Sequence, residues 1–222
     1  MSELARLVLL DCDGTLVDSQ AAIVAAMADA FAACGLGPPE HAAVRRIVGL
    51  SLPAAMAELL PRAEAPEHHR LAEAYKDAHL ARRLAGEPQG ELFEGALAAI
   101  DSLAADGHVL GVATGKSRRG LDSTLERFGL RDRFAVLQTA DDAPSKPHPA
   151  MVEQAMFAAG AVPESTVMVG DTTFDMTMAR AAGVAAIGVA WGYHEAADLH
   201  AAGAVAVLDA FDGLAGLVAE LL

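Results

Sequence analysis

Acidic, hydroxyl and ammonium side chains follow four short apolar runs in this sequence, each near the point where a run ends. They are Asp11 and Asp13 after the first run, Thr114 after the second, Lys146 beyond the third, and Asp171 and Asp175 after the fourth. Carboxylate oxygens are the ligands that Mg²⁺ and other hard cations prefer, and a carboxylate can also act as a covalent nucleophile. This set of residues therefore has the chemistry to bind a metal and an anionic substrate together.

The first acidic pair has an informative spacing. Asp11 and Asp13 are two positions apart, and in an extended chain this spacing points both side chains to the same side. The Cys12 side chain between them should point the other way. We therefore expect both carboxylates to face one ligand.

The apolar runs predict the strands that position these residues. The run 7–10 is apolar throughout, which is typical of a parallel strand buried on both faces. Similar runs lie at 109–113, 134–137, 166–169, 184–189 and, more weakly, 204–208; helix-like stretches lie at 117–128, 147–159 and 174–182. Strands that alternate with helices indicate an α/β fold with a doubly wound, mostly parallel, Rossmann-like sheet. Ligands bind at the carboxyl edge of such a sheet, where the polar residues named above would meet.

One segment departs from this alternation. Between residues 16 and 87 the sequence shows no strand pattern, and helical patterns lie near 19–34, 40–48, 52–60 and 66–84. We predict an all-helical domain at 16–87, inserted into an α/β core domain formed by 1–15 and 88–222.

Composition limits the partners. The 222 residues include 30 Asp and Glu against 16 Lys and Arg, a formal net charge of −14, which repels nucleic acids and anionic membranes. No apolar run approaches the roughly 18 residues that cross a bilayer, and the N-terminal segment lacks a signal-peptide pattern. Two cysteines, Cys12 and Cys34, do not indicate a disulfide framework. We expect a cytoplasmic protein that binds neither nucleic acid nor membrane, and an anionic small substrate would need local cations, backbone N–H groups or a metal to overcome the overall charge.

The same residues resemble, in order, the four motifs of the haloacid dehalogenase-like hydrolase superfamily. Asp11-x-Asp13-Gly-Thr-Leu-Val-Asp-Ser19 resembles the first motif, Thr114 the second, Lys146-Pro-His-Pro149 the third and Gly-Asp171-x-x-x-Asp175 the fourth. The helical insertion after the first motif is similar to the cap of the phosphoglycolate phosphatase-like subgroup. The resemblance implies a phosphatase that acts on a small phosphorylated metabolite and forms an aspartyl phosphate with the help of Mg²⁺.

The resemblance also implies a role for each matched residue. Asp11 would be the nucleophile, and Asp13 would be the general acid and base, with a pKa raised by the crowded negative charge. Thr114 and the backbone N–H of Gly115 would bind the phosphoryl group, and Lys146 would neutralise its charge and steady Asp11. The expected metal ligands are the Asp11 carboxylate, the Asp13 backbone carbonyl and the Asp171 carboxylate, with Asp175 in support.

The substrate is less constrained. Phosphoglycolate is the leading candidate through the subgroup resemblance, while nucleoside monophosphates, phosphosugars and pyrophosphate remain open. Arg45 and Arg46 in the helical insertion are candidates for recognition of the substrate anion. A phosphosugar mutase would share the phosphoaspartate, and the spacing of residues does not separate it from a phosphatase.

Two other classes fit the sequence less well. The run Gly111-Val-Ala-Thr-Gly115-Lys-Ser has three residues between its glycines, whereas a nucleotide-binding P-loop has four. A phospho-accepting receiver module of the signalling type also combines aspartates, Thr and Lys, but its acidic pair precedes the accepting Asp by two strands. A dehalogenase lacks the second carboxylate of the first motif, so Asp13 argues against that reaction.

Overall fold

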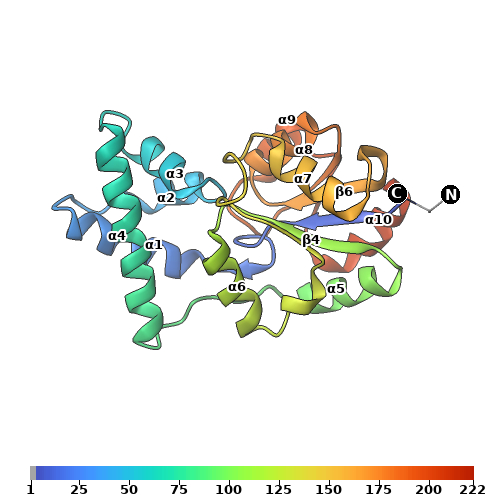
Figure 1. Ribbon diagram of the computed structural model, residues 1–222, viewed down its shortest axis with the longest axis horizontal. Helices are drawn as coiled ribbons and strands as arrows, with labels where there is room; N and C mark the ends of the chain where they lie inside the picture. Colours follow the sequence, from blue (N-terminus) through green and yellow to red (C-terminus); the bar gives the residue numbers. More distant parts are fainter. Residues whose placement is uncertain (1–3) are drawn as a thin grey trace.

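A computed structural model describes residues 4–222 and shows two parts that lie side by side (Figure 1). One part is a six-stranded sheet with helices on both faces. The other part is a group of four helices, α1 to α4, which lies beyond one end of the strands. No helix of residues 4–222 is long and apolar enough to cross a membrane.

The sheet is parallel, with strand order β5-β4-β1-β6-β7-β8. Its strands are β1 (Leu7–Leu10), β4 (Val109–Ala113), β5 (Val136–Gln138), β6 (Thr166–Gly170), β7 (Ala185–Val189) and β8 (Ala206–Leu208). The first strand lies at the centre, where Leu10 pairs with Val112 of β4 on one side and with Val169 of β6 on the other. The ends of the three central strands are therefore level with one another. The predicted doubly wound parallel fold is confirmed.

The sheet is buried on both faces, which explains the continuous apolar runs. Alternate residues of a strand point to opposite faces: Val8 and Leu10 pack into one core, and Leu7 and Leu9 pack into the other. The first core includes residues of α5 (Ala96–Ala105), α6 (Arg118–Arg127) and α10 (Leu214–Leu221). The second includes residues of α7 (Ala150–Ala159), α8 (Thr173–Ala181) and α9 (Ala196–Ala202). Short 3₁₀ helices lie at Arg131–Arg133, Pro163–Ser165 and Phe211–Gly213.

The four-helix unit has a hydrophobic core of its own. Its helices are α1 (Gln20–Ala33), α2 (His41–Ile47), α3 (Leu52–Leu59) and α4 (Ala65–Leu84). Met27 of α1, Met56 of α3 and Leu71 of α4 are at most 1% exposed and belong to one buried cluster. Prolines stand in the first turns of α3 and α4, where the missing N–H would be unpaired in any case. All four helices lie within two residues of the predicted ranges.

A short antiparallel ribbon joins the two parts. Strand β2 (Val17–Asp18) pairs with β3 (Glu91–Leu92), so the chain crosses into the four helices and returns side by side. The prediction that the segment 16–87 contains no strand is therefore wrong at Val17–Asp18, because two residues are too few to show an alternating pattern. Gly90 has a φ of 92°, and a Cβ there would lie 2.3 Å from the carbonyl oxygen of Asp18. The predicted domain boundaries at 16 and 87 stay a prediction.

Two element boundaries in the sheet part differ from the sequence prediction. Strand β5 starts at Val136 rather than 134 because a 3₁₀ turn precedes it and Phe134 is buried in the core. Helix α7 starts at Ala150 rather than 147 because the chain first makes a turn, in which the backbone N–H of His148 donates a hydrogen bond to the carbonyl of Ser145.

The separate core of the four-helix unit leads to a stability prediction. Met56→Ala should lower the free energy of unfolding by about 2–5 kcal/mol, because a fully buried methionine leaves a cavity when it is truncated. Urea denaturation followed by circular dichroism measures this change. Glu58→Ala on the same helix is the control: this exposed position should change stability by no more than about 0.5 kcal/mol. Equal effects of the two substitutions would contradict the packing described here.

Candidate active site

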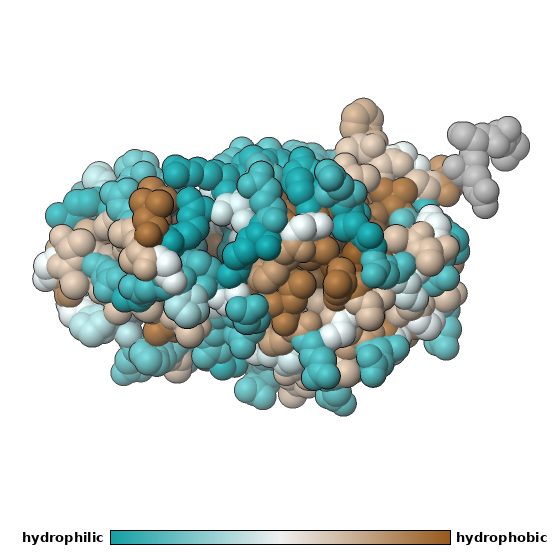
Figure 2. All heavy atoms as spheres, turned by 90° about the horizontal axis from the view of Figure 1, so that it is seen from below, coloured by the Kyte–Doolittle hydropathy of each residue, from teal (hydrophilic) through white to brown (hydrophobic). Residues whose placement is uncertain are grey.

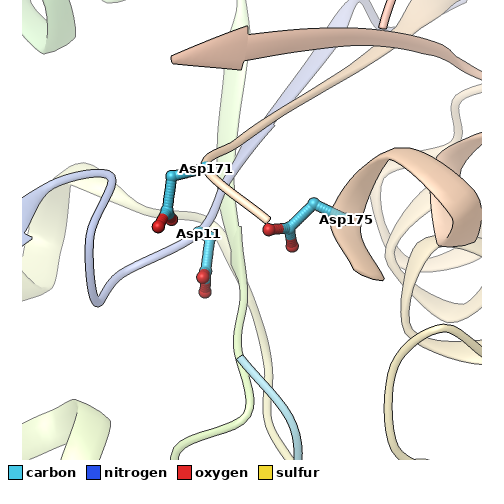
Figure 3. Close-up of side chains that lie close together, drawn as sticks. All are labelled: Asp11, Asp171 and Asp175. Atoms are coloured by element: carbon cyan, nitrogen blue, oxygen red, sulfur yellow. The ribbon is translucent and has the colours of Figure 1, made fainter. Parts of the chain in front are cut away.

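Three carboxylates converge at the carboxyl edge of the sheet (Figure 3). Asp11 follows the end of β1, Asp171 follows the end of β6, and Asp175 lies in the first turn of α8. One oxygen atom of each lies within 4.8 Å of the others, and each residue is at most 1% exposed. The cluster depends on neighbouring parallel strands, because their level ends bring residues 160 positions apart into contact.

Hydrogen bonds fix the two later carboxylates. Asp171 accepts hydrogen bonds from the Thr15 hydroxyl at 2.8 Å and from the Tyr193 backbone N–H at 2.9 Å, one at each oxygen. Asp175 Oδ2 accepts from the backbone N–H and the hydroxyl of Thr172, at 3.1 and 2.7 Å. The positions of both carboxylates are therefore set before any ligand binds.

Lys146 lies inside the acidic cluster. Its Nζ donates a hydrogen bond of 2.6 Å to Asp175 Oδ1 and lies 3.0 Å from Asp11 Oδ1. The residue is 1% exposed, and although burial lowers the pKa of Lys146, the charges of Asp11 and Asp175 outweigh it and raise the pKa above its ordinary value. The ammonium therefore stays charged and holds Asp11 and Asp175 together.

Asp11 differs from its neighbours in having free oxygen atoms. Within residues 4–222, no donor makes a hydrogen bond to either carboxylate oxygen, although Lys146 forms an ion pair with one of them. Burial, opposed by the charge of Lys146 and reinforced by the charges of Asp175 and Asp13, raises the pKa of Asp11 to about 7. Burial and the charges of Asp11 and Asp175 also raise the pKa of Asp171 well above its ordinary value. The single positive charge of Lys146 is therefore too little to neutralise the three carboxylates of this cluster.

The donor set fits a hard divalent cation. Three ionised carboxylates against one ammonium leave two negative charges, which one divalent cation would neutralise. All of the clustered candidate ligand atoms are oxygen, as Mg²⁺ prefers. The Asp11 and Asp171 carboxylates could bind the ion directly, while the bonds of Asp175 to Lys146 and Thr172 suit a supporting position.

Asp13 has a different environment from that expected. Lys116 Nζ lies 2.8 Å from both of its carboxylate oxygens, and the Ser19 hydroxyl donates to Oδ1 at 2.5 Å. Burial by itself raises the pKa of Asp13, but the Lys116 charge and the hydrogen bonds from Lys116 and Ser19 together lower it below its ordinary value. The expected raised pKa is therefore wrong for this structure, because sequence spacing reveals Asp11 beside Asp13 but not Lys116 across 103 positions.

A cavity of about 560 Å³ lies between the four-helix unit and this edge of the sheet. Asp11, Asp13, Thr114 and Gly115 line it, so the structure brings the predicted nucleophile, acid and phosphoryl-binding groups to one space. Lys116 also lines it. Polar residues predominate along the junction of the two parts on the face shown in Figure 2, whereas hydrophobic residues gather over the sheet part.

The two candidate specificity residues lie elsewhere. Arg45 donates hydrogen bonds to Gln20 Oε1 at 2.9 Å and to the backbone carbonyl of Tyr193 at 3.1 Å. Arg46 is exposed. Neither residue lines the cavity described above. The hydrogen bonds of Arg45 instead connect the start of α1 with the loop after β7.

The sequence analysis assigns no role to several residues that hold this site. Lys116 and Ser19 bond to Asp13, and Thr15 and the backbone of Tyr193 bond to Asp171. A sequence signal exists for three of them, because Lys116 directly follows Thr114-Gly115 at a strand end, and Thr15 and Ser19 belong to the first motif. Tyr193 has the pattern of a packing aromatic, and no spacing links it to the acidic cluster.

Together, the fold and the site define a Rossmann-like hydrolase core with a buried acidic centre at the carboxyl edge of its parallel sheet. The chain belongs to the haloacid dehalogenase-like hydrolases: the model of that family matches residues 8–189. The resemblance noted from the four motifs is thereby confirmed.

Individual relatives are similar along nearly the whole chain. A protein of Dickeya dadantii called probable phosphatase IndB is 36% identical over 217 residues, which cover 97% of this chain and 94% of that protein. A phosphoglycolate phosphatase of Rhodospirillum rubrum is 34% identical over 220 residues, covering 94% and 89% of the two chains. The crystal structure of a putative haloacid dehalogenase-like hydrolase from Bacteroides fragilis superimposes with a TM-score of 0.87 at 25% identity, covering 95% of this chain and 99% of that one.

The contact between the two parts at Gly115 leads to a prediction. A Cβ on Gly115 would lie 2.4 Å from the carbonyl oxygen of Gly49 and 2.5 Å from that of Leu50. Gly115→Ala should therefore push the loop between α2 and α3 away from the site and lower kcat/KM at least about 10-fold, since misplaced groups lose the orientation that catalysis needs. Steady-state kinetics measures this loss.

The control for Gly115→Ala is Gly216→Ala. Gly216 lies within α10, where a Cβ would meet no atom within 4 Å. That substitution should leave kcat/KM unchanged and stabilise the protein by about 0.5–1 kcal/mol. Unchanged activity in Gly115→Ala would show that the close approach at Gly49 has no role in the active state.

Proposed function

We propose that this hydrolase is a Mg²⁺-dependent phosphatase that transfers the phosphoryl group of a small phosphate monoester to Asp11 and then to water. The observation that carries the proposal is the state of Asp11: a buried carboxylate that lines the cavity, lies beside a charged lysine and accepts no hydrogen bond from residues 4–222. Carboxylates buried for structural reasons have donors. The Oδ2 atom of Asp11, which has neither a hydrogen bond nor an ion pair with residues 4–222, is available to attack.

Asp11 would act as a covalent nucleophile. Attack of one Asp11 oxygen on phosphorus forms an acyl phosphate and breaks the bond between phosphorus and the alcohol oxygen. Lys146, 3.0 Å from Asp11, would reduce the repulsion between the carboxylate and the incoming dianion. A covalent intermediate divides one difficult step into two easier ones.

Asp13 would supply and later remove the proton. It lines the same cavity as Asp11, so it could protonate the departing alcohol oxygen and then accept a proton from the water that attacks the acyl phosphate. Asp13 must first be protonated, and its bonds to Lys116 oppose this. An incoming phosphate dianion competes for Lys116, which would remove the interaction that lowers the pKa of Asp13.

Thr114 and Gly115 would bind the phosphoryl oxygens. Thr114 stands at the end of β4 and is 1% exposed, and both residues line the cavity. A hydroxyl and a backbone N–H that are already in position can stabilise the charge that develops on phosphoryl oxygens in the transition state.

A bound Mg²⁺ would neutralise negative charge on the phosphoryl group and on the carboxylates around it. The Asp11 carboxylate, the Asp13 backbone carbonyl and the Asp171 carboxylate would hold the ion, and Asp175 would support them. Thr15 and Tyr193 would keep Asp171 oriented through the bonds that they donate.

The α1–α4 unit would act as a cap that closes over the cavity and excludes bulk water. Its separate hydrophobic core and the two-stranded ribbon at its base support motion as one body. Phosphoglycolate is the first substrate to test, because several similar proteins bear the name phosphoglycolate phosphatase. A mutase would share the first step, and net release of inorganic phosphate separates the two.

Removal of the nucleophile tests the central step. Asp11→Asn should reduce phosphate release from an aryl phosphate to background, because an amide is a poor nucleophile, while far-ultraviolet circular dichroism should stay that of the parent. Mass spectrometry of acid-quenched parent enzyme should find a phosphate adduct on Asp11. Activity in Asp11→Asn, or an adduct on another residue, would contradict the assignment of Asp11.

Removal of metal tests the acidic cluster. Phosphate release should stop in excess EDTA and return when Mg²⁺ is added. Asp171→Asn should raise the Mg²⁺ concentration needed for half-maximal activity at least about 10-fold, as changes to metal ligands and their partners commonly do. Asp198→Asn, at an exposed site on α9, should leave it unchanged. Full activity in EDTA would rule out the metal-dependent mechanism.

A further inference from the structure

Helix α4 presents one row of polar side chains to the cavity. Tyr75, His79 and Arg83 follow one another at intervals of four residues and all line the cavity, since residues four apart lie on the same face of a helix. This row belongs to the four-helix unit, whereas the groups already assigned to the phosphoryl transfer lie on the sheet side or, like Ser19, at the start of α1.

Tyr75 and His79 form a pair close to Asp13 and Lys116. Their ring centroids lie 5.9 Å apart at an angle of 42°. Burial raises the pKa of the Tyr75 phenol, and the charges of Lys116 and Asp13 also act on it. Burial lowers the pKa of His79, and the charge of Lys116 lowers it further. Both rings are therefore uncharged at neutral pH, and each can donate or accept a hydrogen bond.

No partner inside the protein accounts for these polar atoms. Between residues 4 and 222, no hydrogen bond of the structure involves the side chain of Tyr75 or His79, although both line a cavity and are only partly exposed. Neither residue is among those with buried unpaired atoms, so their polar atoms are open to the cavity. The hydroxyl groups of a ligand there could bond to them.

The third residue of the row adds charge. The Arg83 guanidinium bonds to the Ser123 hydroxyl of α6, and no carboxylate of the described part of the chain forms an ion pair with Arg83. Arg83 and Ser123 both line the cavity, so their remaining donors are available to oxygen atoms of a ligand.

One part of the cavity wall is apolar, although charged residues such as Arg119 and Arg127 also line the cavity. Ile23 of α1 and Val48 and Leu50 of the loop before α3 line it, and Ile23 and Val48 are each 7% exposed. Its volume of about 560 Å³ falls within the range of roughly 300–1,000 Å³ that is usual for sites of drug-sized ligands. A two-carbon acid such as phosphoglycolate would occupy only a small part and would leave the apolar wall without contacts.

We propose that Tyr75 and His79 bind the alcohol part of the phosphate ester and that this part is a hydroxylated ring, as in a sugar phosphate or a nucleoside phosphate. The proposal rests on the phosphatase function above, because it places the phosphoryl group at Asp11. The faces of the two aromatic rings and the apolar wall would contact the ring of the substrate. His79, Arg83 and Ser123 would bond to its hydroxyl groups.

This proposal assigns substrate selection to α4. Arg45 and Arg46 were the candidates from sequence, but both lie outside the residues that line the cavity. Tyr75 and His79 line the same cavity as Asp13, the group that would protonate the alcohol oxygen.

A comparison of substrates gives the first test. Phosphate release by the Mg²⁺-loaded protein is measured with glucose 6-phosphate, ribose 5-phosphate and a nucleoside 5′-monophosphate as ring-bearing esters, and with phosphoglycolate and ethyl phosphate as two-carbon esters. At least one ring-bearing ester should have a kcat/KM at least about 10-fold above that of both two-carbon esters. A comparison of KM for the two sugar phosphates with KM for the nucleoside monophosphate shows whether a nucleobase adds affinity. A preference for a two-carbon ester would overturn the proposal.

Substitutions on α4 give the second test. His79→Asn and Tyr75→Phe should each raise KM for the preferred ring-bearing ester at least about 5-fold and change kcat/KM for ethyl phosphate less than 2-fold, because ethyl phosphate cannot reach these side chains. His69→Asn, at an exposed position on the same helix, is the matched control and should change neither. Equal losses with both substrates would indicate a structural role and would overturn the proposal.

The two proposals fail in different ways. No phosphate release from any of the five esters, together with none from an aryl phosphate, would contradict the phosphatase function itself. Release that depends on Asp11 but favours two-carbon esters, or that is insensitive to Tyr75→Phe and His79→Asn, would contradict only the binding role of α4.

Discussion

The ion pairs of the buried Lys146 are the interaction on which the site depends. Without this ammonium, Asp11, Asp171 and Asp175 would be three carboxylates within 4.8 Å of one another in a buried space, and burial of unpaired charge costs several kcal/mol per ion. Lys146 offsets only part of that cost. The remaining negative charge is the physical reason that the site suits a divalent cation. Stability and function are therefore linked at one cluster.

The two aspartates of the first motif have pKa values that are shifted in opposite directions, because their neighbouring side chains differ. Asp11 accepts no hydrogen bond from the described chain, and its pKa rises to about 7 through burial. Asp13, two positions later, is also buried but is bonded to Lys116 and Ser19, which together lower its pKa. The difference between the two carboxylates therefore comes from the donors around them and not from their own chemistry.

The positions of most strands and helices followed from local patterns. Parallel strands buried on both faces need continuous apolar runs, so Leu7–Leu10 and Val109–Ala113 were found at their observed bounds. The ribbon at Val17–Asp18 was missed because two residues give no period, and its pairing with Glu91–Leu92 depends on chain segments more than 70 positions apart. The start of β5 was misplaced because Phe134 is apolar for a different reason, its burial beneath a 3₁₀ turn.

The sequence by itself determined the α/β alternation, the helical insertion, and the gathering of Asp11, Asp171 and Lys146 at one edge, because parallel strands place their carboxyl ends together wherever they lie in the chain. Only the tertiary structure decided which charges are paired. The bonds of Lys116 to Asp13 and the row of α4 that faces the cavity, with Tyr75 at its start, arise where separate segments meet. A local pattern reports which face of an element is apolar, but the partner of a polar side chain depends on distances across the folded molecule, and these exist only once the core and the four-helix unit have packed.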